Sequence, residues 1–460
     1  MTGRARRDVA AAAVVGLVLG VAMAWTTRGA LLDDAFISLD YARNVAAGGC
    51  WCVNTGMPSN TATSPLWVLL LSLPMLALGP VAALGAASAV AMAMLAGTVA
   101  ALAHRLGLST LAGPLAAVLV ATSPLMQASI GLESLLAVAL IALGAHEVAA
   151  GRIMTIGVVA GALVLVRPDL AIVSVVLIAV RWRYAAMTVP IAAVAVAPWL
   201  VVSLLWFGTV LPDTLIWKQS QSEGLGGHFF GDAVIVFARI WPAVTWLGMG
   251  AGVAGFGAGL WLFMQARSRG PVVALGVGAA AHLSVLWTLH VAPYPWYPAP
   301  AAGVGMTLLA LSVATPASGR WLGLAASAVL VVTGGAYSAR HDYVALGSPL
   351  NYNRATPSQY AAIVDQVPTG AVVESADELG AFAFFCGDRC AVLDPLSDRG
   401  RLAPILSARL ASSPALRMLY PGYEPDTPRR ADHRVVLGKG GVTTFSGYGG
   451  TSTMDVRPNH

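Results

Sequence analysis

Two adjacent carboxylates, Asp33 and Asp34, are the residues of this chain best suited to chemistry. They follow an apolar segment, residues 9–25, and begin the run Asp33-Asp34-Ala35-Phe36-Ile37-Ser38. Lipid does not solvate a charged carboxylate, so ionisable groups at the mouth of a membrane helix are functional candidates by default. A carboxylate held there can take a proton from a hydroxyl group. We expect one of the pair to act as a general base and the other to orient it or to bind a metal ion.

The composition defines the class of protein that must position this pair. Of the 460 residues, 57% are hydrophobic and 11% are charged, whereas soluble domains carry about 25% charged residues. Apolar stretches recur at lengths of about 20 residues, which is enough to cross a bilayer. The basic residues behind the formal charge of +5 lie at the ends of these stretches, a pattern typical of membrane topology rather than of nucleic-acid binding. The sequence predicts a polytopic membrane protein without a nucleic-acid partner.

The basic residues also predict the orientation. Arg4, Arg6 and Arg7 place the N-terminus in the cytoplasm, and about 11 crossings would keep the later basic turns on that side. Residues 22–24 resemble a signal-peptide cleavage site, but the length of the apolar run favours an uncleaved helix. The predicted spans are residues 9–28, 82–104, 110–127, 132–150, 153–167, 169–181, 185–207, 236–264, 271–290, 297–315 and 320–338. This topology requires residues 65–80 to form a helix along the outer surface.

We therefore predict a mostly α-helical, multi-pass membrane protein with two parts. Residues 1–338 form the transmembrane domain, with a catalytic first outer loop at residues 29–81. From residue 339 charged residues become frequent, and residues 339–460 form a small extracytoplasmic α/β domain. Helices are predicted at 360–367, 377–385 and 401–419, and strands at 371–375, 390–394 and 435–445. Asp377 and Glu378 are interpreted as acidic residues at the start of a helix.

The four cysteines all fall in segments predicted to lie outside, where disulfides persist. They allow three pairings. A bond between Cys386 and Cys390 is plausible across a turn, and Cys50 with Cys52 would close a tight ring. A crossed pairing would tie the α/β domain to the first loop. The spacing disfavours a zinc site made from all four thiolates.

Further polar and aromatic residues fall on the same predicted side as the carboxylates. They are Arg43, Thr63, Ser64, Glu133, Arg167, Asp169, Lys218, Gln219, Tyr294, Trp296 and Tyr297. Each has a structural interpretation by itself, for example Arg167 and Asp169 as a buried pair and the aromatics as an interfacial belt. Their convergence favours the transfer of a sugar from a lipid phosphate. The carboxylate would be the base, and Arg43, Arg167 and Lys218 would bind the lipid phosphate. The others would bind substrate.

In their order along the chain, these motifs resemble the GT-C glycosyltransferases. The resemblance is strongest to the branch that includes the actinobacterial terminal arabinofuranosyltransferases of arabinogalactan synthesis. It covers nearly the whole chain and lies in Asp33-Asp34-Ala35-Phe36-Ile37-Ser38, Tyr41-Ala42-Arg43-Asn44, Thr63-Ser64-Pro65-Leu66-Trp67, Gly131-Leu132-Glu133, Arg167-Pro168-Asp169, Leu211-Pro212-Asp213-Thr214, Pro295-Trp296-Tyr297 and Ala376-Asp377-Glu378-Leu379-Gly380-Ala381.

The resemblance implies a GT-C fold and a polyprenyl-phosphate sugar donor, with decaprenyl-phosphate arabinofuranose as the leading candidate. The acceptor would be an envelope polysaccharide or lipoglycan such as arabinogalactan or lipoarabinomannan. Asp33 or Asp34 would be the catalytic carboxylate. No cofactor is assigned, and a role for a divalent cation stays open. A polyprenyl-phosphate-mannose donor is the alternative within this class; a lipid-glycan flippase or an inactive structural partner are alternatives outside it.

Overall fold

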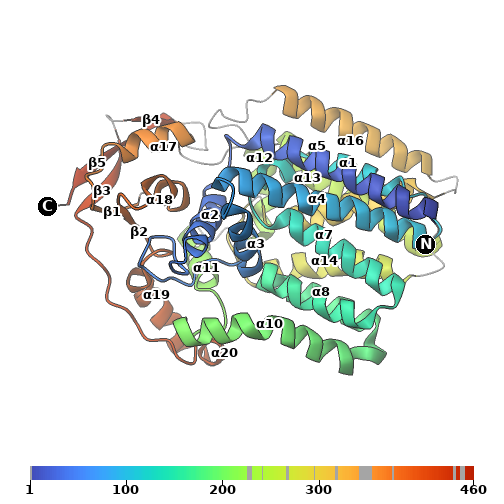
Figure 1. Ribbon diagram of the computed structural model, residues 1–460. Coiled ribbons are helices and arrows are strands. Elements are labelled where there is room, and N and C mark those ends of the chain that lie inside the picture. The colour runs from blue at the N-terminus through green and yellow to red at the C-terminus, as the bar shows by residue number, and fades with distance from the viewer. Residues whose placement is uncertain are drawn as a thin grey trace. The chain divides into compact units, whose positions relative to one another are not determined.

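The computed structural model describes residues 3–224, 230–240, 242–265, 269–294, 296–315, 320–340, 355–375, 378–438, 442–445 and 451–459 (Figure 1). Three residues of the motifs named above lie outside these ranges: Pro295, Ala376 and Asp377. Contacts between residues divide the chain into two compact units. The helical unit consists of Met1–Thr26, Gly85–Ala197 and Phe230–Asp342, and the mixed unit of Thr27–Leu84, Pro198–Phe229 and Tyr343–His460.

The chain is a multi-pass membrane protein by its helices. Six helices are long and apolar enough to cross a bilayer: α1 (Gly3–Thr27), α4 (Pro80–Arg105), α10 (Ala185–Phe207, preceded by η2 at Trp182–Tyr184), α13 (Pro242–Gln265), α14 (Gly270–Thr288) and α16 (Arg320–Arg340). Shorter helices complete the helical unit: α5 (Ala112–Thr122), α6 (Pro124–Ala128), α7 (Ser134–Ala150), α8 (Ile153–Val166), η1 (Pro168–Leu170), α9 (Ala171–Val180), η3 (Phe230–Asp232), α12 (Ala233–Ile240) and α15 (Ala299–Val313). The mostly helical fold confirms the predicted fold class, while the count of 11 spans stays a prediction.

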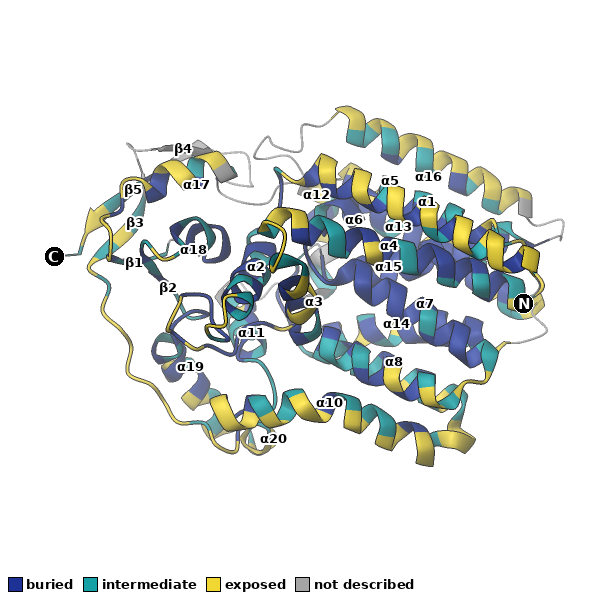
Figure 2. Ribbon diagram, viewed as in Figure 1, coloured by how far each residue is buried: buried dark blue, intermediate teal, exposed yellow. Residues whose placement is uncertain are grey.

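Burial separates the central helices of this unit from the outer ones (Figure 2). Every described residue of α7 from Ser134 to Ala142 is buried, whereas α1 and α16 leave apolar side chains such as Val18 and Leu322 exposed. Exposed apolar surface on long helices is suited to lipid. Small residues allow close helix packing: a Cβ atom at Gly255 of α13 would lie 1.8 Å from the carbonyl oxygen of Gly305 in α15.

The mixed unit joins the first loop to the C-terminal segment. Its helices are α2 (Asp33–Ala46), α3 (Pro65–Met75), α11 (Thr214–Gly224), α17 (Pro357–Val364), α18 (Gly380–Cys386), α19 (Arg399–Ser412) and α20 (Pro414–Leu419). Its strands are β1 (Val372–Glu374), β2 (Ala391–Leu393), β3 (His433–Gly438), β4 (Val442–Phe445) and β5 (Thr451–Pro458). With 11 residues at about 1.5 Å each, α3 is too short to cross a bilayer.

The five strands form one sheet in the order β2-β1-β3-β5-β4. β1 is parallel to β2 and β3, with Val373 opposite Val392, while β5 is antiparallel to β3 and β4. The sequence placed one strand region at 435–445 where β3 and β4 form, and did not foresee β5. The single helix predicted at 401–419 is instead two helices, because Pro414 disfavours a helical conformation at Ser413.

Candidate functional site

The N-terminus of α2 presents the two carboxylates. Asp33 and Asp34 are its first residues, where negative charge is favoured by the helix dipole. Neighbours in a helix are turned by about 100° from each other, so the two side chains leave the helix in different directions. The following contacts show that each meets a different part of the mixed unit.

Asp33 is held by the first turn of α18. Its Oδ1 accepts a hydrogen bond from the backbone N–H of Ala381 at 2.7 Å, and its Oδ2 accepts one from Gly380 at 3.1 Å. A Cβ atom at position 380 would lie 2.1 Å from the backbone oxygen of Asp33. Only glycine therefore permits this approach, and the carboxylate is fixed by two donors far away in the sequence.

Burial changes the proton affinity of Asp33. It raises the pKa of this carboxyl to about 7, and the charges of Asp34 and Asp394 add to the effect, while the N–H groups of Ala381 and Gly380 oppose it. A carboxylate whose pKa lies near neutral pH exchanges protons readily at that pH. This is the property that a general base requires.

Asp34 meets the lysine of α11. The Nζ atom of Lys218 lies 3.6 Å from Oδ2 of Asp34, and the two side chains are 10% and 27% exposed. Gln219 follows on the same helix and is half-buried. The predicted carboxylate pair and one predicted phosphate-binding cation are thus neighbours in the structure. Whether they bind substrate stays a prediction.

The start of α11 is fastened to the first loop. The hydroxyl group of Thr214 donates to the carbonyl oxygen of Thr61 at 2.6 Å, and the N–H of Asp213 donates to the carbonyl oxygen of Asn60 at 2.8 Å. Burial raises the pKa of Asp213 to about 6 although Arg399 opposes it, with its Nε 2.9 Å from Oδ2. The motif at residues 211–214 therefore anchors the start of the helix that carries Lys218.

Tyr41 organises the first loop from α2. Its hydroxyl group lies 2.6 Å from Oγ of Ser59 and 2.8 Å from Oγ1 of Thr61. Burial raises the pKa of Tyr41 to about 12, so it remains a neutral phenol at physiological pH. The Asn54 side chain also pairs with both backbone groups of Val392, at 2.7 and 2.9 Å, and so covers the edge of β2.

The structure forms two short-range disulfides in this unit. Cys50 is bonded to Cys52, and Cys386 is bonded to Cys390. The second bond joins the end of α18 to the residue before β2. Both pairings are local, so neither crosses between the first loop and the C-terminal segment.

Three further predicted site residues, Arg43, Thr63 and Ser64, belong to α2 and to the loop that follows it. Arg43 donates to Oδ1 of Asp40 at 2.6 Å and to the carbonyl oxygen of Phe384 at 3.0 Å. Nine residues separate it from Asp34, or about 13 Å along the helix. Thr63 is exposed, and Ser64 is the buried N-cap residue of α3.

The helical unit contains a second cluster of charge at the break between α8 and α9. Arg167 donates from Nε and Nη2 to both oxygens of Asp169, at 3.0 and 2.8 Å, and from Nη1 to Glu133 at 3.2 Å. Nε2 of His282 lies 2.8 Å from Oδ2 of Asp169. These residues are nearly buried. The geometry matches the buried-pair interpretation of Arg167, and phosphate binding there stays a prediction.

The predicted aromatic residues form a group beside this cluster. Tyr294 and Trp296 are stacked with ring centroids 4.6 Å apart, and the Tyr297 ring lies 6.0 Å from Tyr294. The guanidinium group of Arg167 lies 5.1 Å from the Tyr297 ring centroid, a cation–π distance. Tyr297 thus supports the charged cluster, and a substrate role for the stacked pair stays a prediction.

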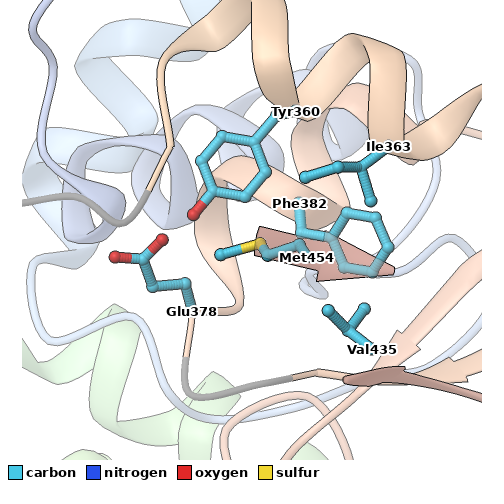
Figure 3. A pocket seen from close by; sticks show the side chains of 6 residues that line it. All are labelled: Tyr360, Ile363, Glu378, Phe382, Val435 and Met454. Atoms are coloured by element: carbon cyan, nitrogen blue, oxygen red, sulfur yellow. The ribbon is translucent and has the colours of Figure 1, made fainter. Parts of the chain in front are cut away.

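A small pocket in the mixed unit lies on the α17 side of α18 (Figure 3). Its cavity volume is about 10 Å³, and it is lined by Tyr360, Ile363, Glu378, Phe382, Val435 and Met454. Ligand pockets usually measure about 300–1,000 Å³. We therefore do not assign the substrate site to it. Within the described ranges, no group of three or more His, Cys, Asp or Glu side chains could hold a metal ion.

Sequence reasoning missed two components of the site. The backbone N–H groups of Gly380 and Ala381 carry no side-chain signal. Asp394 follows β2, and its position at the carboxyl end of a parallel strand was the available signal. Both become visible only when the C-terminal segment is folded against α2.

Comparison with solved structures identifies the fold. ArnT from Cupriavidus metallidurans, bound to undecaprenyl phosphate, matches with a TM-score of 0.57 and 13% identity over 95% of this chain and 93% of that protein. The apo oligosaccharyltransferase of Archaeoglobus fulgidus matches with a TM-score of 0.55 and 10% identity over 92% of this chain and 69% of the other. No protein-family model matches the chain, and no curated protein sequence matches it.

The arabinofuranosyltransferase AftD from Mycobacteria also shares this architecture. The TM-score is 0.52 and the identity 19%, over 94% of this chain but 35% of AftD, so this chain corresponds to about a third of that protein. At these identities the likeness defines the fold. The chain has the GT-C fold of membrane glycosyltransferases.

Proposed function

We propose that this protein is a membrane glycosyltransferase that moves a sugar from a polyprenyl phosphate to an acceptor hydroxyl group. The observation that carries the proposal is the site at the start of α2, where Asp33 and Asp34 lie beside Lys218 in a GT-C fold. The three groups supply what the reaction requires: a base for the acceptor and positive charge for the departing phosphate.

We assign the base to Asp33 and the phosphate contact to Lys218. Asp33 has the pKa near neutral pH and is held in place by two N–H groups. Asp34 orients the Lys218 ammonium group until the donor phosphate replaces it as the partner. The acceptor oxygen then attacks the anomeric carbon, the bond to the phosphate oxygen breaks, and Asp33 takes the acceptor proton.

The donor and acceptor follow from the sequence resemblance and from what the neighbours bind. ArnT was solved with undecaprenyl phosphate, which supports a lipid-phosphate donor here. AftD is named as an arabinofuranosyltransferase, which supports decaprenyl-phosphate arabinofuranose. We propose that the site faces the exterior of a bacterial plasma membrane and extends an envelope polysaccharide or lipoglycan.

The test is transfer by the purified protein in lipid nanodiscs. Labelled decaprenyl-phosphate arabinofuranose and, separately, decaprenyl-phosphate mannose are supplied with a panel of oligosaccharide acceptors. We expect a covalent arabinosyl product. Asp33→Asn should lower the rate by about 10²–10⁴-fold, and Asp34→Asn should lower it less, because Lys218 remains.

The outcomes separate the alternatives. Preference for mannose would reassign the donor, and movement of labelled lipid without a covalent product would favour a flippase. If transfer is detected and both Asn variants retain the wild-type rate, the assignment of the active site is wrong. Thermal unfolding of each variant shows whether a lost rate reflects lost structure.

A further inference from the structure

Asp394 lies at the carboxyl end of strand β2, and helix α18 begins at this same end of the strands. The segment β1–α18–β2 is a parallel crossover, so the start of its helix and the end of its second strand share one edge of the sheet. Asp33 binds the first turn of that helix, at Gly380 and Ala381. Asp394 is the first residue after β2 and therefore lies on the same edge.

A tight turn fixes the Asp394 side chain. Its Oδ1 accepts hydrogen bonds from the N–H groups of Leu396 at 2.7 Å and Ser397 at 2.9 Å, and its own N–H donates to Oγ of Ser397 at 3.0 Å. Both donors bind one oxygen of the carboxylate. The negative charge is thus held at a defined place.

A chain of hydrogen bonds brings Lys218 to this turn. The hydroxyl group of Thr61 donates to the carbonyl oxygen of Leu396 at 2.8 Å, and its carbonyl oxygen accepts from Thr214 at 2.6 Å. Lys218 follows Thr214 by four residues, so both lie on one face of α11. Burial raises the pKa of Asp394 to about 6, and the positive charge of Lys218 opposes this rise. This opposing effect agrees with the path of hydrogen bonds from Lys218 to the turn.

We propose that Asp394 is a positioning residue of the active site, which shares the Lys218 ammonium group with Asp34 and places a third negative charge beside Asp33. The inference deepens the proposed function and rests on it. It assigns to the C-terminal segment a direct influence on the base, since Asp394 acts on Asp33 and Lys218 without contacting the reacting atoms.

The charged groups around Asp33 make the effect specific. On its own helix, Asp34 acts on it, and Asp33 in turn acts on Asp40. Asp394 acts from the end of β2, and Lys218 approaches from α11. The adjoining helices α3 and α18 contain no charged residue. Removing the Asp394 charge therefore lowers the pKa of Asp33, because one like charge disappears.

The test is the variant Asp394→Asn. Asparagine retains an Oδ1 acceptor for Leu396 and Ser397, so the substitution removes charge while keeping the turn. We expect the acid limb of the pH–rate profile to move to lower pH by roughly half a pH unit or more. Asp365→Asn is the matched control, because that side chain is 78% exposed and pairs with Arg389, and its profile should equal that of the wild type.

A second measurement does not depend on activity. Infrared pH titration follows the carboxyl band that disappears in Asp33→Asn, and its midpoint should fall in Asp394→Asn. Ser397→Ala disturbs the turn but keeps the charge, so a profile that moves equally in this variant would assign a purely structural role. The inference would be overturned if, in a folded Asp394→Asn protein, neither the acid limb of the pH–rate profile nor the midpoint of the infrared carboxyl band moved. A wild-type protein that transfers no sugar would refute the proposed function alone, since the infrared titration still decides the role of Asp394.

Discussion

The two charged clusters of this protein differ in how closely the described ion pairs approach and in how far they are exposed. In the helical unit, Arg167 binds both oxygens of Asp169 and one of Glu133, and these side chains are 8%, 12% and 8% exposed. In the mixed unit, Lys218 approaches Asp34 at 3.6 Å, and the Asp34 side chain is 27% exposed. The first cluster is closed, while the second is looser and more open to solvent.

This difference indicates different roles. A planar guanidinium group that pairs with two carboxylates is well suited to hold a broken membrane helix together. A lysine shared among acidic neighbours can exchange its partner for a phosphate. The comparison teaches that charge within a membrane protein is a guide to function only together with the geometry of its partners.

Among the variants that test this difference between the clusters, Arg167→Gln is expected to have the largest effect. The change leaves Asp169 and Glu133 in a nearly buried place without their cation, which costs about 3–5 kcal/mol for a buried pair. We expect a large drop in the thermal unfolding temperature of the purified protein, with any loss of transfer following from it. A stable Arg167→Gln protein with impaired donor binding would instead support the phosphate role predicted from the sequence.

Lys218→Gln should give the opposite result. Loss of one preorganised group that stabilises developing charge costs about 10²–10³-fold in kcat, and we expect the unfolding temperature to change little. The control is Arg409→Gln, which removes a positive charge that pairs with Glu223 of the same helix α11 at a more exposed position. If both variants lose activity equally, the charge of Lys218 has no special role.

Gly380→Ala tests how the mixed unit holds its base. The added methyl group would overlap the backbone of Asp33, and overpacking of this kind costs about 1–3 kcal/mol. We expect reduced transfer and a lower unfolding temperature. Gly79→Ala is the control, because nothing lies within 4 Å of its Cβ position. A fully active Gly380→Ala protein would show that the Asp33–α18 contact is dispensable.

The helical unit was the more predictable of the two. Long apolar stretches such as residues 82–104 and 271–290 can only be satisfied as helices in lipid, and α4 and α14 form there. The break at Arg167-Pro168-Asp169 was also visible, because proline and charge interrupt a helix. The contact between His282 and Asp169 could not be predicted, because two residues separated by 113 positions leave no local pattern in the sequence.

For the candidate site of the mixed unit, the sequence reveals only the side chains. Asp33, Asp34 and Lys218 stand out by charge in an apolar chain. The helix α11 that carries Lys218 was not foreseen, and neither was the contact with Gly380. Short elements of 3 to 8 residues, such as β1 and α17, have weak periodicity, and they are placed by contacts that pattern alone does not reveal.

The most gradual expected effect is the pH dependence of the mixed unit, which is spread over several pH units. Because the pKa of Asp33 is raised from 3.8 in the unfolded chain to about 7, the folded state binds the proton more tightly. The stabilisation is therefore complete below pH 4 and is lost as the pH rises through 7, by up to about 1.4 kcal/mol per pH unit. Asp33→Asn lacks this dependence. We expect the difference in stability between wild type and Asp33→Asn, measured by chemical unfolding in detergent, to fall from pH 4 to 7 and then to level off. The rate of transfer should instead rise as the pH approaches 7, because the base ionises. A stability difference that does not change between pH 4 and 7 would mean that Asp33 is ionised in both the folded and the unfolded protein over this range, and Asp34 would then be the better candidate for the base.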